Sequence, residues 1–174
     1  MKRIQSLPAI ALALSGAGAF AQTANMAVSA TIAGSCSVVA NPLAFSVYDP
    51  LSATALTVQT TAVITCTTGA GASLAMGIGA NSTGTGATAQ RRMRVGATAN
   101  YVSYNIYQPS GTAEGAACAY TTPWGNGTTG GNTLAIGVAP TPTSRTYNVC
   151  GEIPALQAAA VGSYVDTVVV TANL

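Results

Sequence analysis

The sequence has no histidine, and it has no lysine after Lys2. Charged residues make up only 6% of its 174 residues. Without histidine or an available lysine, a nucleophilic side chain would lack its usual activating base, so we do not expect an enzyme. If Lys2 and Arg3 are removed with a leader, four arginines balance four acidic residues, and nothing attracts nucleic acid by net charge. We expect the cluster of Arg91, Arg92 and Arg94 to be a strand edge with solvated arginines.

The sequence also lacks motifs for cofactors, metals or paired acids. Residues 125–130 match G-x-G-x-x-G, but they follow Pro123 and Trp124 and open no helix, so we expect a glycine-rich turn. The four cysteines show no C-x-x-C spacing, and no histidine could complete a zinc site. The acidic residues lie in unrelated segments, which argues against glycoside hydrolysis; they are Asp49, Glu114, Glu152 and Asp166.

The first segment has the features of an export signal. Lys2 and Arg3 form a basic start, an apolar run covers residues 4–20, and Ala19-Phe20-Ala21 provides the small-x-small pattern of a cleavage site. We predict that residues 1–21 are a signal peptide. The chain is therefore expected to pass through the periplasm to the cell surface or to be secreted.

All four cysteines lie after this leader. An even number of cysteines in an exported chain indicates two disulfides, for which three connectivities are possible. We expect sequential pairing, Cys36 with Cys66 and Cys118 with Cys150. Each bond would close a loop of about thirty residues and contribute roughly 3–4 kcal/mol on the chain-entropy model.

Short β-branched and alternating runs, separated by glycine, proline and asparagine, predict an all-β chain. Such spacing favours a sandwich of antiparallel sheets. The expected strands cover residues 26–33, 37–39, 56–66, 73–78, 92–95, 102–107, 134–138, 146–152 and 164–174.

The two outermost expected strands leave two alternatives open. Near the start, Met26, Val28, Ala30 and Ile32 alternate with smaller or polar residues and form one apolar face. At the other end, residues 162–174 form a strand with no later sequence to pair with it. Either the two strands pair within one molecule, or the first strand of one molecule completes the next. The residues alone favour pairing within one molecule.

From Cys36 onward, the chain resembles the spore coat protein U domain, whose fold is shared with subunits of archaic chaperone-usher pili of the Csu type. The resemblance follows the family's order over nearly the whole chain after the leader. It rests on residues 34–38 (GSCSV), 43–50 (LAFSVYDP), 63–67 (VITCT), 92–93 (RM), 101–107 (YVSYNIY), 123–127 (PWGNG), 147–153 (YNVCGEI) and 162–168 (GSYVDTV).

The resemblance implies an incomplete immunoglobulin-like antiparallel β-sandwich, residues 34–174, that lacks its last strand. Residues 22–33 would be the donor extension that completes the next subunit, with Met26, Val28, Ala30 and Ile32 entering its groove. A periplasmic chaperone would lend a strand first, and an outer-membrane usher would exchange it for that donor. The implied acceptor wall of the groove consists of Val165, Thr167, Val168, Val169, Val170 and Leu174.

The leading hypothesis is therefore an exported structural subunit that polymerises by donor-strand complementation into a pilus or surface fibre for adhesion or biofilm formation. The alternative is a self-complete secreted sandwich that binds carbohydrate or forms part of a spore or cell coat. For carbohydrate binding, aromatic side chains could form a sugar platform, although such residues more often belong to a core. The candidates are Tyr101, Tyr104, Tyr107, Tyr120 and Trp124.

Overall fold

The computed structural model describes residue 18 and residues 21–174, so the expected signal peptide, residues 1–21, lies almost entirely outside the described residues. The chain divides into two units, Met1–Ile32 and Ala33–Leu174. The structure has no strand over residues 26–33, where one was expected. A single segment without a partner strand has no ladder hydrogen bonds to hold it extended.

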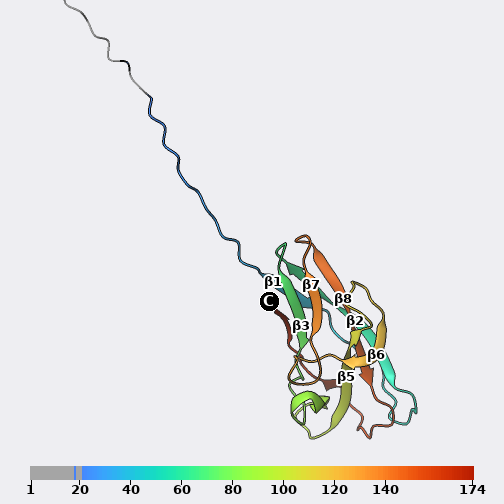
Figure 1. The fold of residues 1–174 in the computed structure, drawn as a ribbon. Helices are drawn as coiled ribbons and strands as arrows, with labels where there is room; N and C mark the ends of the chain where they lie inside the picture. The colour runs from blue at the N-terminus through green and yellow to red at the C-terminus, as the bar shows by residue number, and fades with distance from the viewer. Residues whose placement is uncertain (1–17, 19–20) are drawn as a thin grey trace, which may run out of the picture. The chain divides into compact units, whose positions relative to one another are not determined.

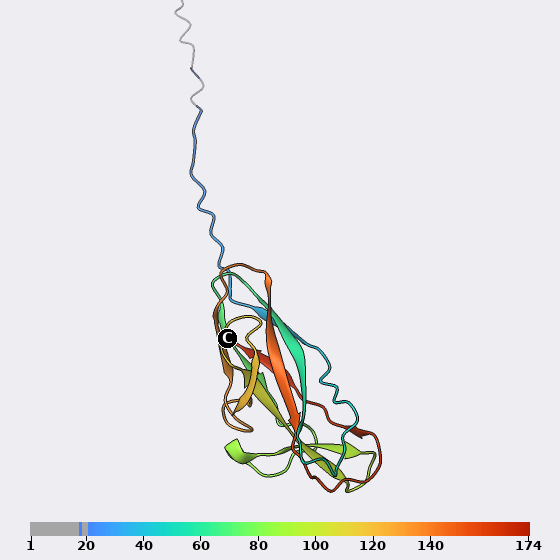
Figure 2. The same ribbon diagram turned by 90° about the vertical axis from the view of Figure 1, so that its right-hand side faces the viewer.

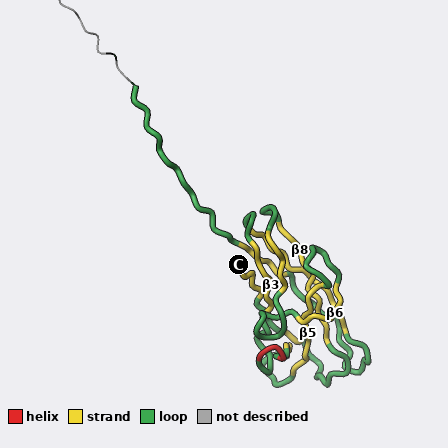
Figure 3. The backbone as a smooth tube through the Cα atoms, in the orientation of Figure 1, coloured by secondary structure: helices red, strands yellow, loops and turns green. Residues whose placement is uncertain are grey.

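The second unit is built from strands, with one short 3-10 turn, η1 (Figure 3). No helix within the described part of the chain has the length and apolar character needed to cross a membrane. The elements are β1 (Cys36–Ala40), β2 (Leu56–Cys66), β3 (Gly71–Met76), η1 (Gly86–Thr88), β4 (Arg91–Val95), β5 (Tyr101–Pro109), β6 (Cys118–Pro123), β7 (Leu134–Val138), β8 (Ser144–Ile153), β9 (Tyr164–Val165) and β10 (Val170–Asn173).

The strands form two antiparallel sheets that make a sandwich-like arrangement (Figures 1 and 2). The larger sheet has the order β1-β2-β8-β5-β4-β9, with β6 paired to β5, and the smaller has the order β10-β3-β7. Alternate residues of each strand point inward, so that the two sheets together enclose the core. Its fully buried members include Ile64, Leu74, Met76, Trp124 and Tyr147.

Most of the expected strands are confirmed to within a few residues, but two predictions were wrong besides the one over residues 26–33. No strand was expected over residues 118–123, where the structure has β6. The expected strand over residues 164–174 is two strands, β9 and β10, which belong to different sheets. Residues 166–169 therefore cross from the larger sheet to the smaller one, and we call them the crossover.

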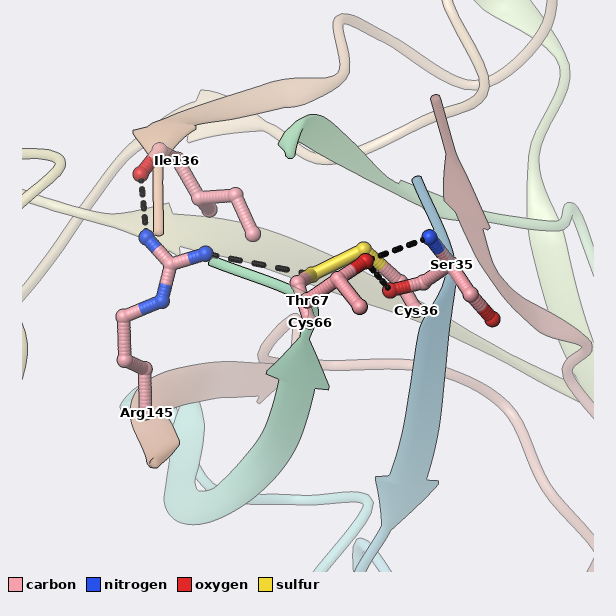
Figure 4. The surroundings of a disulfide bond; sticks show 6 residues. All are labelled: Ser35, Cys36, Cys66, Thr67, Ile136 and Arg145. Carbon is pink, nitrogen blue, oxygen red and sulfur yellow. Dashed lines mark hydrogen bonds between the residues drawn. A yellow bond between two sulfur atoms is a disulfide. The ribbon is translucent and has the colours of Figure 1, made fainter. Parts of the chain in front are cut away.

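Two disulfides fasten the larger sheet. Cys36 is bonded to Cys66, its direct partner in the β1–β2 ladder, and Cys118 is bonded to Cys150, which links β6 to β8. Beside the first bond, the buried Arg145 of β8 donates to the Ile136 carbonyl of β7 at 2.8 Å (Figure 4). This hydrogen bond ties the two sheets together at the end where β1 begins.

Candidate functional site

Two strand edges lie next to each other on one side of the sandwich. β1 is paired only with β2, and β10 only with β3, among residues 33–174. The two strands lie side by side but belong to different sheets, and Figure 1 places the end of the chain, marked C, beside β1. Unpaired edges of this kind are available for pairing with another strand.

The ladder shows which backbone groups of the C-terminal segment point to the open side. Gly77 donates its N–H to the Val169 carbonyl at 2.8 Å, and Ala80 donates to the Thr167 carbonyl at 3.1 Å. Because backbone groups alternate in direction along an extended strand, those of Val168 and Val170 point away from β3. They face the open side of the sandwich.

The same reasoning applies to β1. Asn41 donates to the Thr61 carbonyl at 3.0 Å, and Thr67 donates to the Ser35 carbonyl at 2.9 Å. The intervening Val38 therefore directs its backbone groups away from β2. Both edges thus present free donors and acceptors on the same side of the molecule.

Next to the adjoining ends of these two strands the core is open. A cavity of about 410 Å³ lies between residues 40–45, at the end of β1, and residues 164–170. Met76, Tyr104 and Ile106 form part of its floor. This cavity and an adjoining one of about 840 Å³ share the side chains of four residues, and we call the two together the groove. The shared residues are Leu43, Phe45, Met93 and Tyr164.

The expected acceptor residues fall on two faces of the C-terminal segment. Val168 and Val170 pack against the core and line the groove. Val165 and Thr167 also border it, but their side chains are exposed. The remaining two, Val169 and Leu174, are 67% and 68% exposed and line neither cavity.

Asp166 holds the start of the crossover. Its Oδ1 accepts hydrogen bonds from the Ala80 N–H at 2.9 Å, the Asn81 N–H at 3.2 Å and the Asn81 Nδ2 at 3.1 Å. Its Oδ2 accepts a hydrogen bond from the Tyr104 hydroxyl at 2.7 Å. These bonds explain why a single strand over residues 164–174 was a wrong expectation: the Asp166 side chain is bound to another loop.

Arg91 supports that loop from the core side. Its side chain is 4% exposed and donates to the carbonyls of Met76, Gly77 and Trp124. The expectation of solvated arginines is thus wrong for Arg91, because β4 turns this side chain inward. Burial lowers the pKa of Arg91. Burial and the hydrogen bond to Asp166 raise the pKa of Tyr104, so its hydroxyl remains a donor.

The expected donor residues lie in the first unit. Met26, Val28 and Ile32 are 84%, 85% and 86% exposed, and Ala30 is exposed as well. Large apolar side chains are rarely exposed in such a regular series.

The aromatic residues do not form one platform. Trp124 and Tyr104 are buried in the core, and Trp124 donates its indole N–H to the Leu74 carbonyl at 2.9 Å. Tyr107 and Tyr120 meet edge to face at 6.0 Å. The interpretation as core residues is therefore confirmed for Tyr104 and Trp124.

The glycine-rich motif is a turn. In residues 125–130, the Asn126 side chain accepts hydrogen bonds from the Thr128 and Thr129 N–H groups. No helix follows it in the described chain. Two of the carboxylates also bind backbone: Asp49 accepts from the Leu51 N–H and Glu114 from the Thr146 N–H. Within residues 21–174, no three cysteine, aspartate or glutamate side chains lie close enough together to hold a metal ion.

Comparison with known proteins gives a family and a fold. The family described as the Spore Coat Protein U domain matches residues 22–171. No curated protein matches the chain. A similar chain occurs in the crystal structure of the CsuC–CsuE chaperone–tip adhesion subunit pre-assembly complex from archaic chaperone-usher Csu pili of Acinetobacter baumannii. The two chains are 17% identical with a TM-score of 0.54, over 83% of this chain and 40% of that one.

Proposed function

Because the chain belongs to the spore coat protein U domain family, we propose that it is an exported structural subunit that assembles by donor-strand complementation. Residues 22–33 of one subunit occupy the groove of the next, and the product is a chaperone-usher type pilus or surface fibre for adhesion or biofilm formation. The observation that carries this proposal is the open groove next to two unpaired strand edges.

In this proposal the second unit is an immunoglobulin-like sandwich that is one strand short. An added strand would find an apolar floor below it and free backbone groups on β1 and β10 beside it. Strand addition of this kind gains affinity from main-chain hydrogen bonds and specificity from pockets for alternate side chains. The groove offers both.

The exposed segment at residues 22–33 is a suitable occupant. Met26, Val28, Ala30 and Ile32 share one face of an extended chain, and each is exposed. Burial of Met26, Val28 or Ile32 would contribute about 1.5–3 kcal/mol for each side chain. Each ladder hydrogen bond would add about 0.5–1.5 kcal/mol. The small Ala30 fills its position less completely than a larger residue would.

Such an assembly grows in one dimension. The donor segment of each subunit and the groove of the next are different surfaces, so the contact is heterologous and does not close on itself. Repetition of this contact produces a fibre. No catalytic residue or cofactor takes part.

We propose two further partners for the route to the surface. A periplasmic chaperone covers the groove before assembly, and an outer-membrane usher is the place where the donor replaces it. The similar chain, which was solved as part of a chaperone–subunit pre-assembly complex, supports the first partner. The two disulfides support folding outside the reducing cytosol.

An unboiled gel of the exported protein tests this function. Subunits joined by strand exchange should run as a ladder, and heating should collapse the ladder to one band. The variant Ile32→Asp should remove most of the ladder, because a charged side chain would enter the apolar groove. Its matched control is Thr31→Asp, which places the same charge on the opposite face and should leave the ladder intact.

A wild-type protein that runs as a single band without heating would overturn the proposal and favour a self-complete secreted sandwich. Equal effects of the two aspartate variants would instead show that the donor face is misassigned.

A further inference from the structure

The crossover determines which side chains of the C-terminal segment face the groove. β9 is paired with β4 in the larger sheet, whereas β10 is paired with β3 in the smaller sheet. Between them the chain must leave one sheet and join the other. Val168 lies in the crossover and Val170 follows it directly, so the position of the crossover fixes their placement in the groove.

Among the described residues, Asp166 is the only one in the crossover whose side chain forms hydrogen bonds with other segments. Three of its bonds come from residues 80 and 81, and the fourth comes from the core residue Tyr104. Asp166 therefore binds the loop after β3 with one oxygen and the floor of the groove with the other.

The Asp166 carboxylate lies close against the loop after β3. Gly79 has a φ of +84°, and a Cβ added there would overlap the Asp166 carboxylate. At the end of β3, where this loop begins, Arg91 donates to the Met76 and Gly77 carbonyls at 3.1 and 2.9 Å. The loop that receives Asp166 is thus fixed by a second buried side chain.

We propose that Asp166 is a positioning residue for the acceptor edge: it anchors the crossover, and so keeps Val168 and Val170 turned into the groove with their backbone groups free for an incoming strand. This inference rests on the proposed function. It predicts that loss of the Asp166 carboxylate impairs the ability of a subunit to accept a donor, while its ability to donate is unchanged because residues 22–33 are untouched.

Mixed assembly separates accepting from donating. The full chain carrying Asp166→Ala is co-exported with a tagged wild-type chain, and mass spectrometry counts the variant copies in each band of the unboiled ladder. A subunit that donates but accepts poorly can occupy only one end of an oligomer. We therefore expect at most one variant copy in nearly every band, and a drop of about tenfold in oligomers made by the variant alone.

Two variants and two controls sharpen the result. Asp166→Asn retains an acceptor for the Ala80 and Asn81 N–H groups and should restore acceptance in part. Tyr104→Phe removes only the 2.7 Å bond to Asp166 and should have a smaller effect. The matched controls are Glu152→Ala and Tyr107→Phe, which remove a carboxylate and a hydroxyl that bind each other at 3.4 Å on β8 and β5. Neither control should change the ladder.

Hydrogen exchange distinguishes positioning from a general loss of stability. In Asp166→Asn, exchange should accelerate in residues 166–172 and remain unchanged in β2 and β8. Several variant copies per band, or faster exchange throughout the unit, would overturn the inference. If Asp166→Ala is absent from every band, the Tyr104→Phe variant provides the test instead. An unchanged gel ladder for Tyr104→Phe would also overturn the inference. Absence of a ladder from the wild-type chain would instead contradict the proposed function.

Discussion

Gly79 lies where the loop after β3 meets Asp166 of the crossover. Its φ of +84° lies in the left-handed region that side chains other than glycine rarely adopt, and the Asp166 carboxylate occupies the space where its Cβ would be. Two independent features therefore favour glycine at this position: the backbone conformation and the close approach of Asp166.

These two reasons can be separated by substitution. Gly79→Ala should lower the free energy of unfolding by more than Gly84→Ala, as measured by urea denaturation. Gly84 has a similar φ of +77°, but the nearest atoms to its added Cβ lie at 3.7 Å, so it serves as the matched control. Conformational strain alone costs on the order of 1–3 kcal/mol at each site. Equal losses in the free energy of unfolding would mean that the Asp166 side chain moves aside at no cost and does not hold the crossover.

At the same scale, the spacing of the acidic residues argued against a catalytic pair but did not show what each side chain binds. Asp49 and Asp166 both accept backbone N–H bonds. The burial of Arg91 could not be inferred, because its three carbonyl acceptors come from segments that only the fold brings together. Charge alone had indicated a solvated side chain.

At the scale of elements, regular alternation was a reliable guide where a strand stays in one sheet. β2 matches its expected bounds, 56–66, because its inward residues repeat with a period of two. The segment over residues 164–174 alternates equally well, yet it forms two strands. Its division depends on hydrogen bonds that Asp166 accepts from residues more than eighty positions away, which no local pattern contains.

β6 was missed for a related reason. Its residues, 118–123, include no regular apolar alternation and end in a proline. The strand forms through its pairing with β5 and the disulfide from Cys118 to Cys150. Both constraints come from distant parts of the chain.

The two disulfides provide a test at this scale. They close loops of nearly equal length, with sequence separations of 30 and 32. Replacing either pair by alanine should therefore cost a similar amount of stability, about 3–4 kcal/mol on the chain-entropy model. In addition, only the loss of Cys36 and Cys66 should weaken the oligomer ladder on the unboiled gel, because Cys36 fixes β1 at the open edge.

The measurements are urea denaturation and unboiled gels of the two double variants. If removal of Cys118 and Cys150 weakens the ladder as much as removal of Cys36 and Cys66, then β1 has no special part in accepting a strand.

At the scale of the whole molecule, the all-β class and the antiparallel sheets were predictable from strand spacing. The groove was not predictable from pattern alone, because it is formed by residues 40–50 and 159–170, which are brought together only when the two sheets pack. The residues alone favoured closure of the sandwich by its own first strand. The family resemblance favoured exchange between molecules, and the open edges of β1 and β10 support that alternative.

Photo-crosslinking between isotopically distinct chains tests whether residues 22–33 of one chain fill the groove of another. A photoreactive residue replaces Val28, equal amounts of heavy and light chains are assembled together, and mass spectrometry identifies the cross-linked peptides. Strand exchange between molecules predicts cross-links from residues 22–33 to the groove segments 40–50 and 159–170, with heavy joined to light as often as random mixing allows. Cross-links to the groove that join only peptides of the same label would contradict it, because they would show that each chain fills its own groove.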